Sequence, residues 1–179
     1  MPTPIGHALG GLAAGAAVAG RGNHRWFGSH PWLILSVWAL CGVLPDVDFL
    51  VGGHRELTHT LGAVAGVGCV TAILARHRPL LWLAATAAYS THLLLDWLGA
   101  DDAAPLGIMA LWPFADAYYL SPYSLFPAVC RHVSSVGCRV DLVEAVAWEV
   151  LILGPTAALA VWLRHRQRTD PRVNPLRPD

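Results

Sequence analysis

The chain has 179 residues, enough for one domain, and 55% of them are hydrophobic whereas only 13% are charged. A soluble domain carries about 25% charged residues, so a soluble protein of this composition would expose large apolar surfaces. The formal net charge of zero argues against a protein that binds nucleic acid through electrostatic attraction. The composition therefore indicates a protein whose apolar surface is covered by a lipid bilayer.

Apolar segments recur along the chain, and we expect each to form one helix of a membrane bundle. They are residues 4–20, 31–51, 58–75, 79–98 and 142–163. A helix needs about 20 residues to cross the hydrocarbon core, so the second, fourth and fifth qualify and the others are marginal. We predict an all-α, polytopic membrane helical bundle with about five transmembrane helices. The domain covers residues 1–165, and a disordered cytoplasmic tail covers 166–179.

The arginines predict how this bundle is oriented in the membrane. Arginines follow the first, third and fifth apolar segments, which all exit on one side: Arg21, Arg25, Arg76, Arg78, Arg164, Arg166 and Arg168. The positive-inside rule places that side in the cytoplasm. We therefore expect an inner-membrane protein with its N-terminus outside and its C-terminus in the cytoplasm. Because arginines follow the first segment instead of preceding it, we do not expect a signal peptide.

Histidines and acids gather at the ends of the segments predicted to lie outside. They are His7, Asp46, Asp48, His54, His59, His92 and Asp96. The orientation was derived from arginines alone, so this convergence on one face supports a functional site independently. Unpaired ionisable groups inside a membrane are costly, and they commonly mark function.

His92 and Asp96 are spaced i, i+4 in the fourth segment, so their side chains project from one face of a helix. This spacing lets an imidazole and a carboxylate bind one cation. The alternative is a structural hydrogen bond from His92 to Asp96. Asp46 and Asp48 follow Pro45, and an extended backbone there would place both carboxylates on one side.

A set of mixed histidine and aspartate ligands suits zinc, and also manganese or iron. We predict one or two divalent ions held by His7, Asp46, His59, His92 and Asp96. Such a centre activates water for attack on a phosphoester or an acyl group. For catalysis we expect Asp48 or His54 to assist proton transfer and Arg55 to hold a phosphate through two hydrogen bonds. Rival interpretations are a metal or ion transporter and a non-enzymatic membrane scaffold.

Five motifs together resemble the LexA-regulated, membrane-bound metal-dependent hydrolase family. They are His7, LPDVD at 44–48, HRELTHT at 54–60, HLLLD at 92–96 and WPF at 112–114, covering most of residues 1–125. The resemblance implies an inner-membrane protein with metal-dependent hydrolase activity. We expect its substrate to be a membrane lipid or a lipid-linked phosphoester at the extracytoplasmic face.

The order of ligands is also similar to that of zinc-dependent phospholipase C and the P1-type nucleases. This similarity implies that Asp46, His59, His92 and Asp96 hold one metal, and that His7 helps to hold a second. The chain departs from the pattern downstream, because no HxxxH or HxxxD pair follows Asp96.

The longest connection, residues 99–141, has two interpretations. Its aromatic residues form an interfacial belt, or the segment forms a lid over the metal site. Asp116, Glu144 and Glu149 either add ligands or line a polar interior. A disulfide between Cys130 and Cys138 is expected if this connection faces an oxidising compartment.

Overall fold

The structure is a computed structural model that describes residues 1–19, 31–50, 55, 57–102, 104–129 and 136–169. Its regular elements are α1 (Pro4–Ala19), α2 (Pro31–Val43), the 3₁₀ helices η2 (Leu44–Leu50) and η3 (Leu57–His59), α3 (Leu61–Leu74), α4 (Pro79–Leu98) and α5 (Val136–Thr169). The predicted all-α class is confirmed for the described residues, in which isolated bridges are the one form of β pairing.

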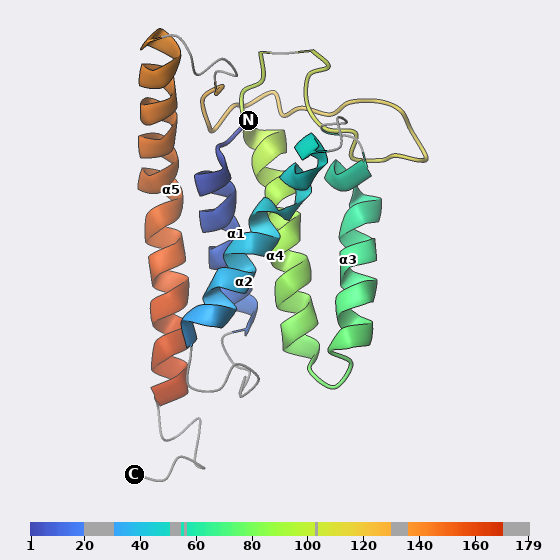
Figure 1. Cartoon of the computed structure of the whole chain (residues 1–179), viewed down its shortest axis with the longest axis vertical. Coiled ribbons are helices and arrows are strands. Elements are labelled where there is room, and N and C mark those ends of the chain that lie inside the picture. Colours follow the sequence, from blue (N-terminus) through green and yellow to red (C-terminus); the bar gives the residue numbers. More distant parts are fainter. Residues whose placement is uncertain (20–30, 51–54, 56, 103, 130–135, 170–179) are drawn as a thin grey trace.

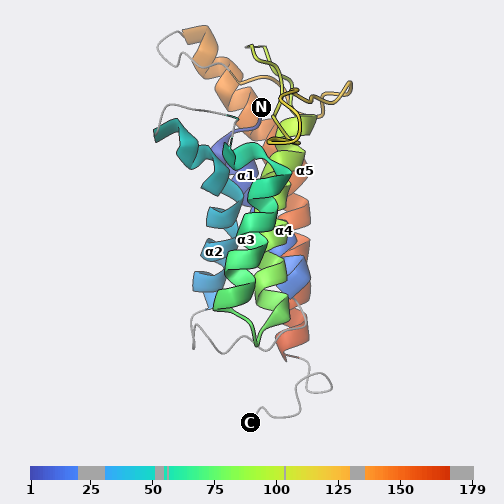
Figure 2. The same cartoon turned by 90° about the vertical axis from the view of Figure 1, so that its right-hand side faces the viewer.

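Helices α1 and α4 form the centre of the bundle. Helix α1 packs against α2, α4 and α5, while α4 packs against α1, α2 and α3. Helices α1, α3, α4 and α5 run roughly along one long axis, α2 crosses obliquely in Figure 1, and α5 and α3 lie at opposite edges of that view (Figures 1 and 2). We call the end where α1 begins and α4 ends the upper end, as Figure 1 draws it.

Two glycines allow α1 and α2 to approach closely near the upper end. A Cβ added at Gly11 would lie 2.6 Å from the carbonyl oxygen of Trp38, and one at Gly42 would lie 2.3 Å from that of His7. Both contacts are with backbone atoms, which cannot move aside as a side chain can. Small residues at these positions therefore fix how α1 places His7 relative to α2.

Among the residues that the structure describes, two helices are long and apolar enough to cross a membrane, namely Trp32–Phe49 and Gly137–Gln167. Helices Pro4–Ala19 and Leu61–Leu74 are apolar but shorter. Helix α4, the fourth predicted span, has the expected length of 20 residues, yet it is not apolar enough to be counted with these two. Helix α4 is the most polar of the central helices because it carries His92 and Asp96 among its buried residues.

The ends of the bundle differ in charge as the sequence predicted. Arg76 and Arg78 lie in the connection between α3 and α4, at the lower end of Figure 1. Arg164 and Arg166 lie near the lower end of α5. His7 lies near the start of α1 and Asp96 near the end of α4, both at the upper end.

Residues 99–129, which we call the upper segment, pass over the upper end of the bundle (Figure 1). A parallel bridge joins Gly99 to Phe126, and an antiparallel bridge joins Ile108 to Tyr119. Ile108 and Phe126 are buried, so the segment packs onto the helices along part of its length.

Several local expectations change in the structure. Helix α5 begins at Val136 and continues to Thr169, past the predicted boundary of the tail; residues 170–179 lie outside the described part. Thr60 caps α3, because its hydroxyl accepts a hydrogen bond from the amide of Ala63. Cys138 is disulfide-bonded, and Cys130 lies outside the described residues.

Candidate metal centre

The structure brings together all five residues that the sequence predicted as metal ligands. His7 comes from α1, Asp46 from η2, His59 from η3, and His92 and Asp96 from α4. They form two groups whose candidate ligand atoms lie within 4.8 Å of one another: Asp46, His59 and His92, and His7, His92 and Asp96. The three histidines and Asp96 are at most 1% exposed.

The Nε2 atoms of His59 and His92 lie close to carboxylate oxygens of both Asp46 and Asp96. The Nε2 atom of His92 lies 3.0 Å from His59 Nε2, 3.2 Å from Asp96 Oδ2 and 3.5 Å from Asp46 Oδ1. His59 Nε2 lies 3.4 Å from Asp96 Oδ2 and 3.9 Å from Asp46 Oδ1. Ligand atoms about 2.0–2.1 Å from a tetrahedral zinc ion are about 3.4 Å apart, so these five distances are close to those around such an ion.

The hydrogen-bond partners of the Nδ1 atoms of His59 and His92 determine that Nε2 of each ring faces this centre. His92 Nδ1 lies 2.8 Å from the carbonyl oxygen of Gly42, which only accepts hydrogen bonds. His59 Nδ1 lies 3.1 Å from Asp48 Oδ2. Two neutral rings that donate through Nδ1 turn the lone pairs of their Nε2 atoms towards each other, and a cation between them would relieve this repulsion. Ligating histidines are commonly oriented in this way.

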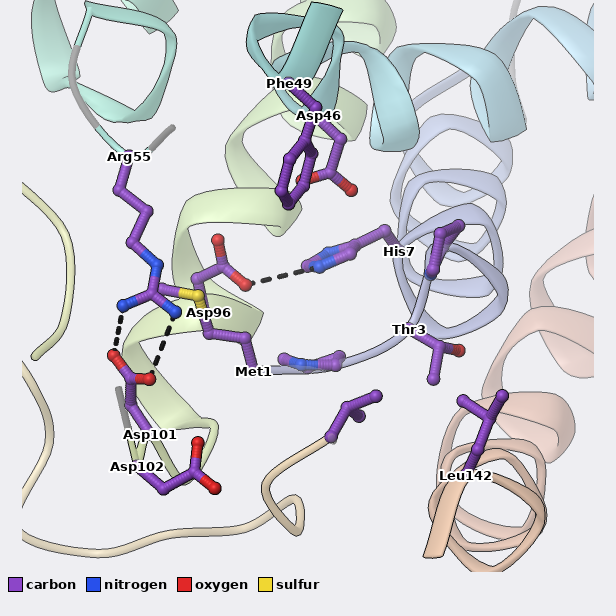
Figure 3. A pocket seen from close by; sticks show the side chains of 13 residues that line it. Met1, Thr3, His7, Asp46, Phe49, Arg55, Asp96, Asp101, Asp102 and Leu142 are labelled. Carbon is purple, nitrogen blue, oxygen red and sulfur yellow. Dashed lines mark hydrogen bonds and ion pairs between the residues drawn. The ribbon is translucent and has the colours of Figure 1, made fainter. Parts of the chain in front are cut away.

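Asp96 faces both groups of ligands. Its Oδ2 atom lies near His59 and His92, and its Oδ1 atom lies 3.2 Å from His7 Nε2 (Figure 3). Neither carboxylate oxygen, however, makes a hydrogen bond of acceptable geometry in the structure. A buried carboxylate without such bonds is costly, and coordination to a cation is one of the few ways to offset that cost. A carboxylate with one oxygen towards each group can also bridge two ions.

His7 extends the centre on one side. Its ring stacks on that of His92, with ring centroids 3.7 Å apart and an angle of 18° between the planes. Its Nδ1 atom is buried and makes no hydrogen bond. His7 therefore has a nitrogen towards Asp96 and is placed to complete the second ligand group, as the sequence predicted.

Asp46 and Asp48 lie on opposite sides of the His59 ring. The segment after Pro45 is a 3₁₀ helix, not the extended backbone considered from the sequence, so the two carboxylates do not share one side. Asp46 faces Nε2 of His59, whereas Asp48 faces Nδ1. Asp48 Oδ2 also accepts hydrogen bonds from the Thr58 hydroxyl at 2.8 Å and the Arg55 amide at 3.0 Å. Asp48 thus contacts the outer side of a candidate ligand.

A cavity of about 190 Å³ opens beside the centre, and His7, Asp46 and Asp96 line it together with Phe49 and Leu142 (Figure 3). It combines carboxylates with apolar side chains from η2 and α5. A small polar group attached to an apolar chain would find both kinds of surface here.

The remaining predicted catalytic residues have different outcomes. Arg55 lines the cavity, and its guanidinium forms a two-pronged ion pair with Asp101, as the dashed lines in Figure 3 show. His54 lies outside the described residues.

Met1, which was not predicted to take part in the site, also lines the cavity. Burial lowers the pKa of its amino group, although Asp96 opposes the shift.

Sequence reasoning missed Asp101 and Asp102, which also line the cavity. A buried arginine needs a carboxylate partner, so the acidic pair just after HLLLDWL was the available signal. Asp116 is exposed and does not line the cavity. Glu149 is buried against Thr3, and Glu144 lines a separate open cavity near Trp148.

Comparison with known proteins adds one finding to this geometry. No curated protein and no solved structure is significantly similar to the chain. A protein family matches it over residues 1–168, a range that contains every candidate ligand and all five α-helices up to the last turn of α5. The chain therefore belongs to the YdjM inner membrane protein family.

Proposed function

We propose that this protein is a metal-dependent hydrolase of the inner membrane that acts on a phosphoester of a lipid or lipid-linked substrate at the extracytoplasmic face. One observation carries the proposal. Ligand atoms from η2, η3 and α4 converge beside a cavity, and the buried carboxylate of Asp96 faces the imidazole nitrogens of His7, His59 and His92. This donor set fits zinc best, with manganese or iron as alternatives.

A divalent ion bound there would supply Lewis-acid chemistry for hydrolysis. The protein's own groups have separate tasks. Asp46, His59, His92 and Asp96 would hold the first ion, and His7 with Asp96 would help to hold a second. Asp48 keeps His59 in the tautomer that presents Nε2 to the centre.

Proton transfer requires a group that reaches the cavity. The sequence named Asp48 or His54 for this task. Asp48 contacts the side of His59 that faces away from the other ligands, which favours an orienting role. His7 lines the cavity and lies 3.2 Å from Asp96 Oδ1, so it is the better placed proton carrier when only one ion is bound.

The position of the cavity supports a substrate attached to the membrane. Its lining residues come from the upper end of the bundle, opposite the arginines at the lower end, and the positive-inside rule therefore supports an extracytoplasmic site. The disulfide-bonded Cys138, close to the upper end of α5, fits an oxidising compartment on that side. Phe49 and Leu142 in the cavity wall provide apolar contacts for a lipid chain.

The rival transporter needs a polar path to the other face. In the described residues, the buried cluster below the centre is apolar and contains Ile34, Trp38, Ala84 and Ala88. This core offers an ion no ligands among its members, which favours a site that is open to one face. A purely structural scaffold has no need for a buried carboxylate that faces three imidazole nitrogens beside a cavity.

The experiment is a metal analysis of protein purified in detergent, followed by hydrolysis assays on a panel of phosphoesters. Wild-type protein and the control variant His77→Ala, an exposed histidine in the α3–α4 connection, are expected to hold stoichiometric metal. His59→Ala and Asp96→Ala are expected to lose both metal and hydrolysis.

Folded wild-type protein that takes up no zinc, manganese or iron would refute the metal centre. Metal binding without hydrolysis of any phosphoester, combined with metal-dependent transport into vesicles, would instead favour the transporter.

A further inference from the structure

Arg55 is positioned as a structural connector and not as a free cation in the cavity. Its side chain is buried, with 4% of the residue exposed. Nη2 donates to Asp101 Oδ1 at 3.0 Å, while Nη1 donates to Asp101 Oδ2 and, at 2.9 Å, to the carbonyl oxygen of Pro105. A guanidinium engaged by a carboxylate in this two-pronged way has a fixed orientation.

Asp101 in turn organises the upper segment. Its Oδ2 atom accepts a hydrogen bond of 2.9 Å from the amide of Gly107. Gly107 has a φ of +90°, and a Cβ there would lie 2.3 Å from the carbonyl oxygen of Tyr119. The carboxylate of Asp101 therefore connects Arg55 to a turn that is packed tightly within the upper segment.

The backbone of Arg55 is linked to the candidate metal centre. Its φ of 73° is in the left-handed region, which is unusual for a residue with a side chain. In this conformation its amide donates to Asp48 Oδ2 at 3.0 Å, and the same oxygen lies 3.1 Å from His59 Nδ1. A continuous series of contacts thus leads from Asp101 through Arg55 and Asp48 to His59.

We propose that Arg55 and Asp101 are positioning residues whose buried ion pair couples the upper segment to His59 and thereby sets the affinity of the centre for its metal. The proposal rests on the proposed metal centre. It replaces the phosphate contact that the sequence predicted for Arg55, since Asp101 and Pro105 occupy both of its terminal nitrogens.

The test compares zinc affinity, measured by competition with a chromophoric chelator, in wild-type protein and three variants. Asp101→Asn is expected to weaken binding about tenfold to a hundredfold, as changes in groups that orient metal ligands do. Arg55→Lys keeps the charge but loses the two-pronged geometry, so we expect a smaller loss. Asp116→Asn, an exposed acid on the same segment, is the matched control and should change affinity less than twofold.

Two further measurements separate positioning from general destabilisation. Cobalt substituted for zinc should show an altered visible absorption spectrum in Asp101→Asn and an unaltered one in Asp116→Asn, because the position of His59 changes in the first alone. In metal-free protein, limited proteolysis should cut the upper segment faster in Asp101→Asn than in wild-type.

The outcomes distinguish this inference from the proposed function. If wild-type protein binds zinc and Asp101→Asn and Arg55→Lys bind it equally well, the coupling is refuted and the metal centre stands. If the wild-type protein binds no metal, the proposed centre fails and the coupling fails with it. A stronger phosphate inhibition in wild-type than in Arg55→Lys, with equal zinc affinity, would restore Arg55 to the substrate.

Discussion

Two carboxylates are buried in apolar helices of this protein, and their surroundings differ. Glu149 in α5 is 0% exposed; its Oε1 accepts from the Thr3 amide at 2.7 Å, and its Oε2 accepts from the Thr3 hydroxyl. Asp96 in α4 is 1% exposed, yet neither of its oxygens makes a hydrogen bond of acceptable geometry. Protein donors stabilise the first carboxylate, whereas the second faces imidazole nitrogens and a cavity.

This difference separates a structural carboxylate from a candidate ligand. The side chain of Glu149, from α5, contacts Thr3 just before α1 begins. Its negative charge interacts favourably with the positive end of the α1 dipole, and this contact holds α5 against α1. The groups nearest to Asp96 are imidazole nitrogens that can themselves bind a metal, so a cation would suit this site. Burial alone would not have distinguished them.

The largest expected effect comes from Asp96→Asn, which removes the charge that a metal needs. We expect the variant to fold in detergent and to bind no stoichiometric zinc, while Glu149→Gln retains it. Inductively coupled plasma mass spectrometry of both proteins, with helical content checked by circular dichroism, measures this contrast. Equal metal content in the two variants would remove the distinction drawn between the carboxylates.

Removal of the metal by a chelator should have the next largest effect. A ligand present at 100 times its dissociation constant stabilises the folded protein by about 2.7 kcal/mol. Chelation should therefore lower the thermal midpoint of the wild-type protein and of Glu149→Gln, but leave Asp96→Asn unchanged. A shift in Asp96→Asn as large as that in wild-type would show that the metal binds elsewhere.

Asp48→Asn should weaken zinc binding without abolishing it. The Thr58 hydroxyl, the Arg55 amide and His59 Nδ1 all approach Asp48 Oδ2; an asparagine oxygen there can still accept from these donors but loses the negative charge that orients and polarises the His59 ring. Loss of an orienting group typically weakens affinity tenfold to a hundredfold, or about 1.4–2.7 kcal/mol. Chelator competition measures this change, and complete loss of zinc would make Asp48 a ligand instead.

The sequence identified the clustered histidines and aspartates because their signals are local. The i, i+4 spacing of His92 and Asp96 needs only a helix, and the arginine pattern needs only alternating spans to place the ligands at one end. The side of His59 on which Asp48 lies was not predictable, because it depends on whether the backbone after Pro45 is extended or 3₁₀.

Contacts between distant residues account for most of what the sequence missed. Arg55 and Asp101 are separated by 46 positions, and Thr3 and Glu149 by 146, so neither spacing gives a periodic signal. All five apolar segments were also predicted to be transmembrane helices, although they differ in length and polarity. His92 and Asp96, which make α4 useful at the centre of the bundle, are also why α4 is not among the helices apolar enough to cross a membrane.

Glu149→Gln should have the smallest effect, and it sharpens the comparison because it should leave the metal centre intact. Glutamine keeps one acceptor for Thr3 but loses the charge, so we expect about 1 kcal/mol of lost stability. Thr3→Val removes the other partner's hydroxyl. In a double-mutant cycle the two changes should be less than additive, because both act on the same contact. Additive losses in thermal unfolding would mean that Glu149 stabilises the fold through groups other than Thr3. A zinc affinity altered more than twofold in Glu149→Gln would mean that Glu149, like Asp96, contributes to metal binding.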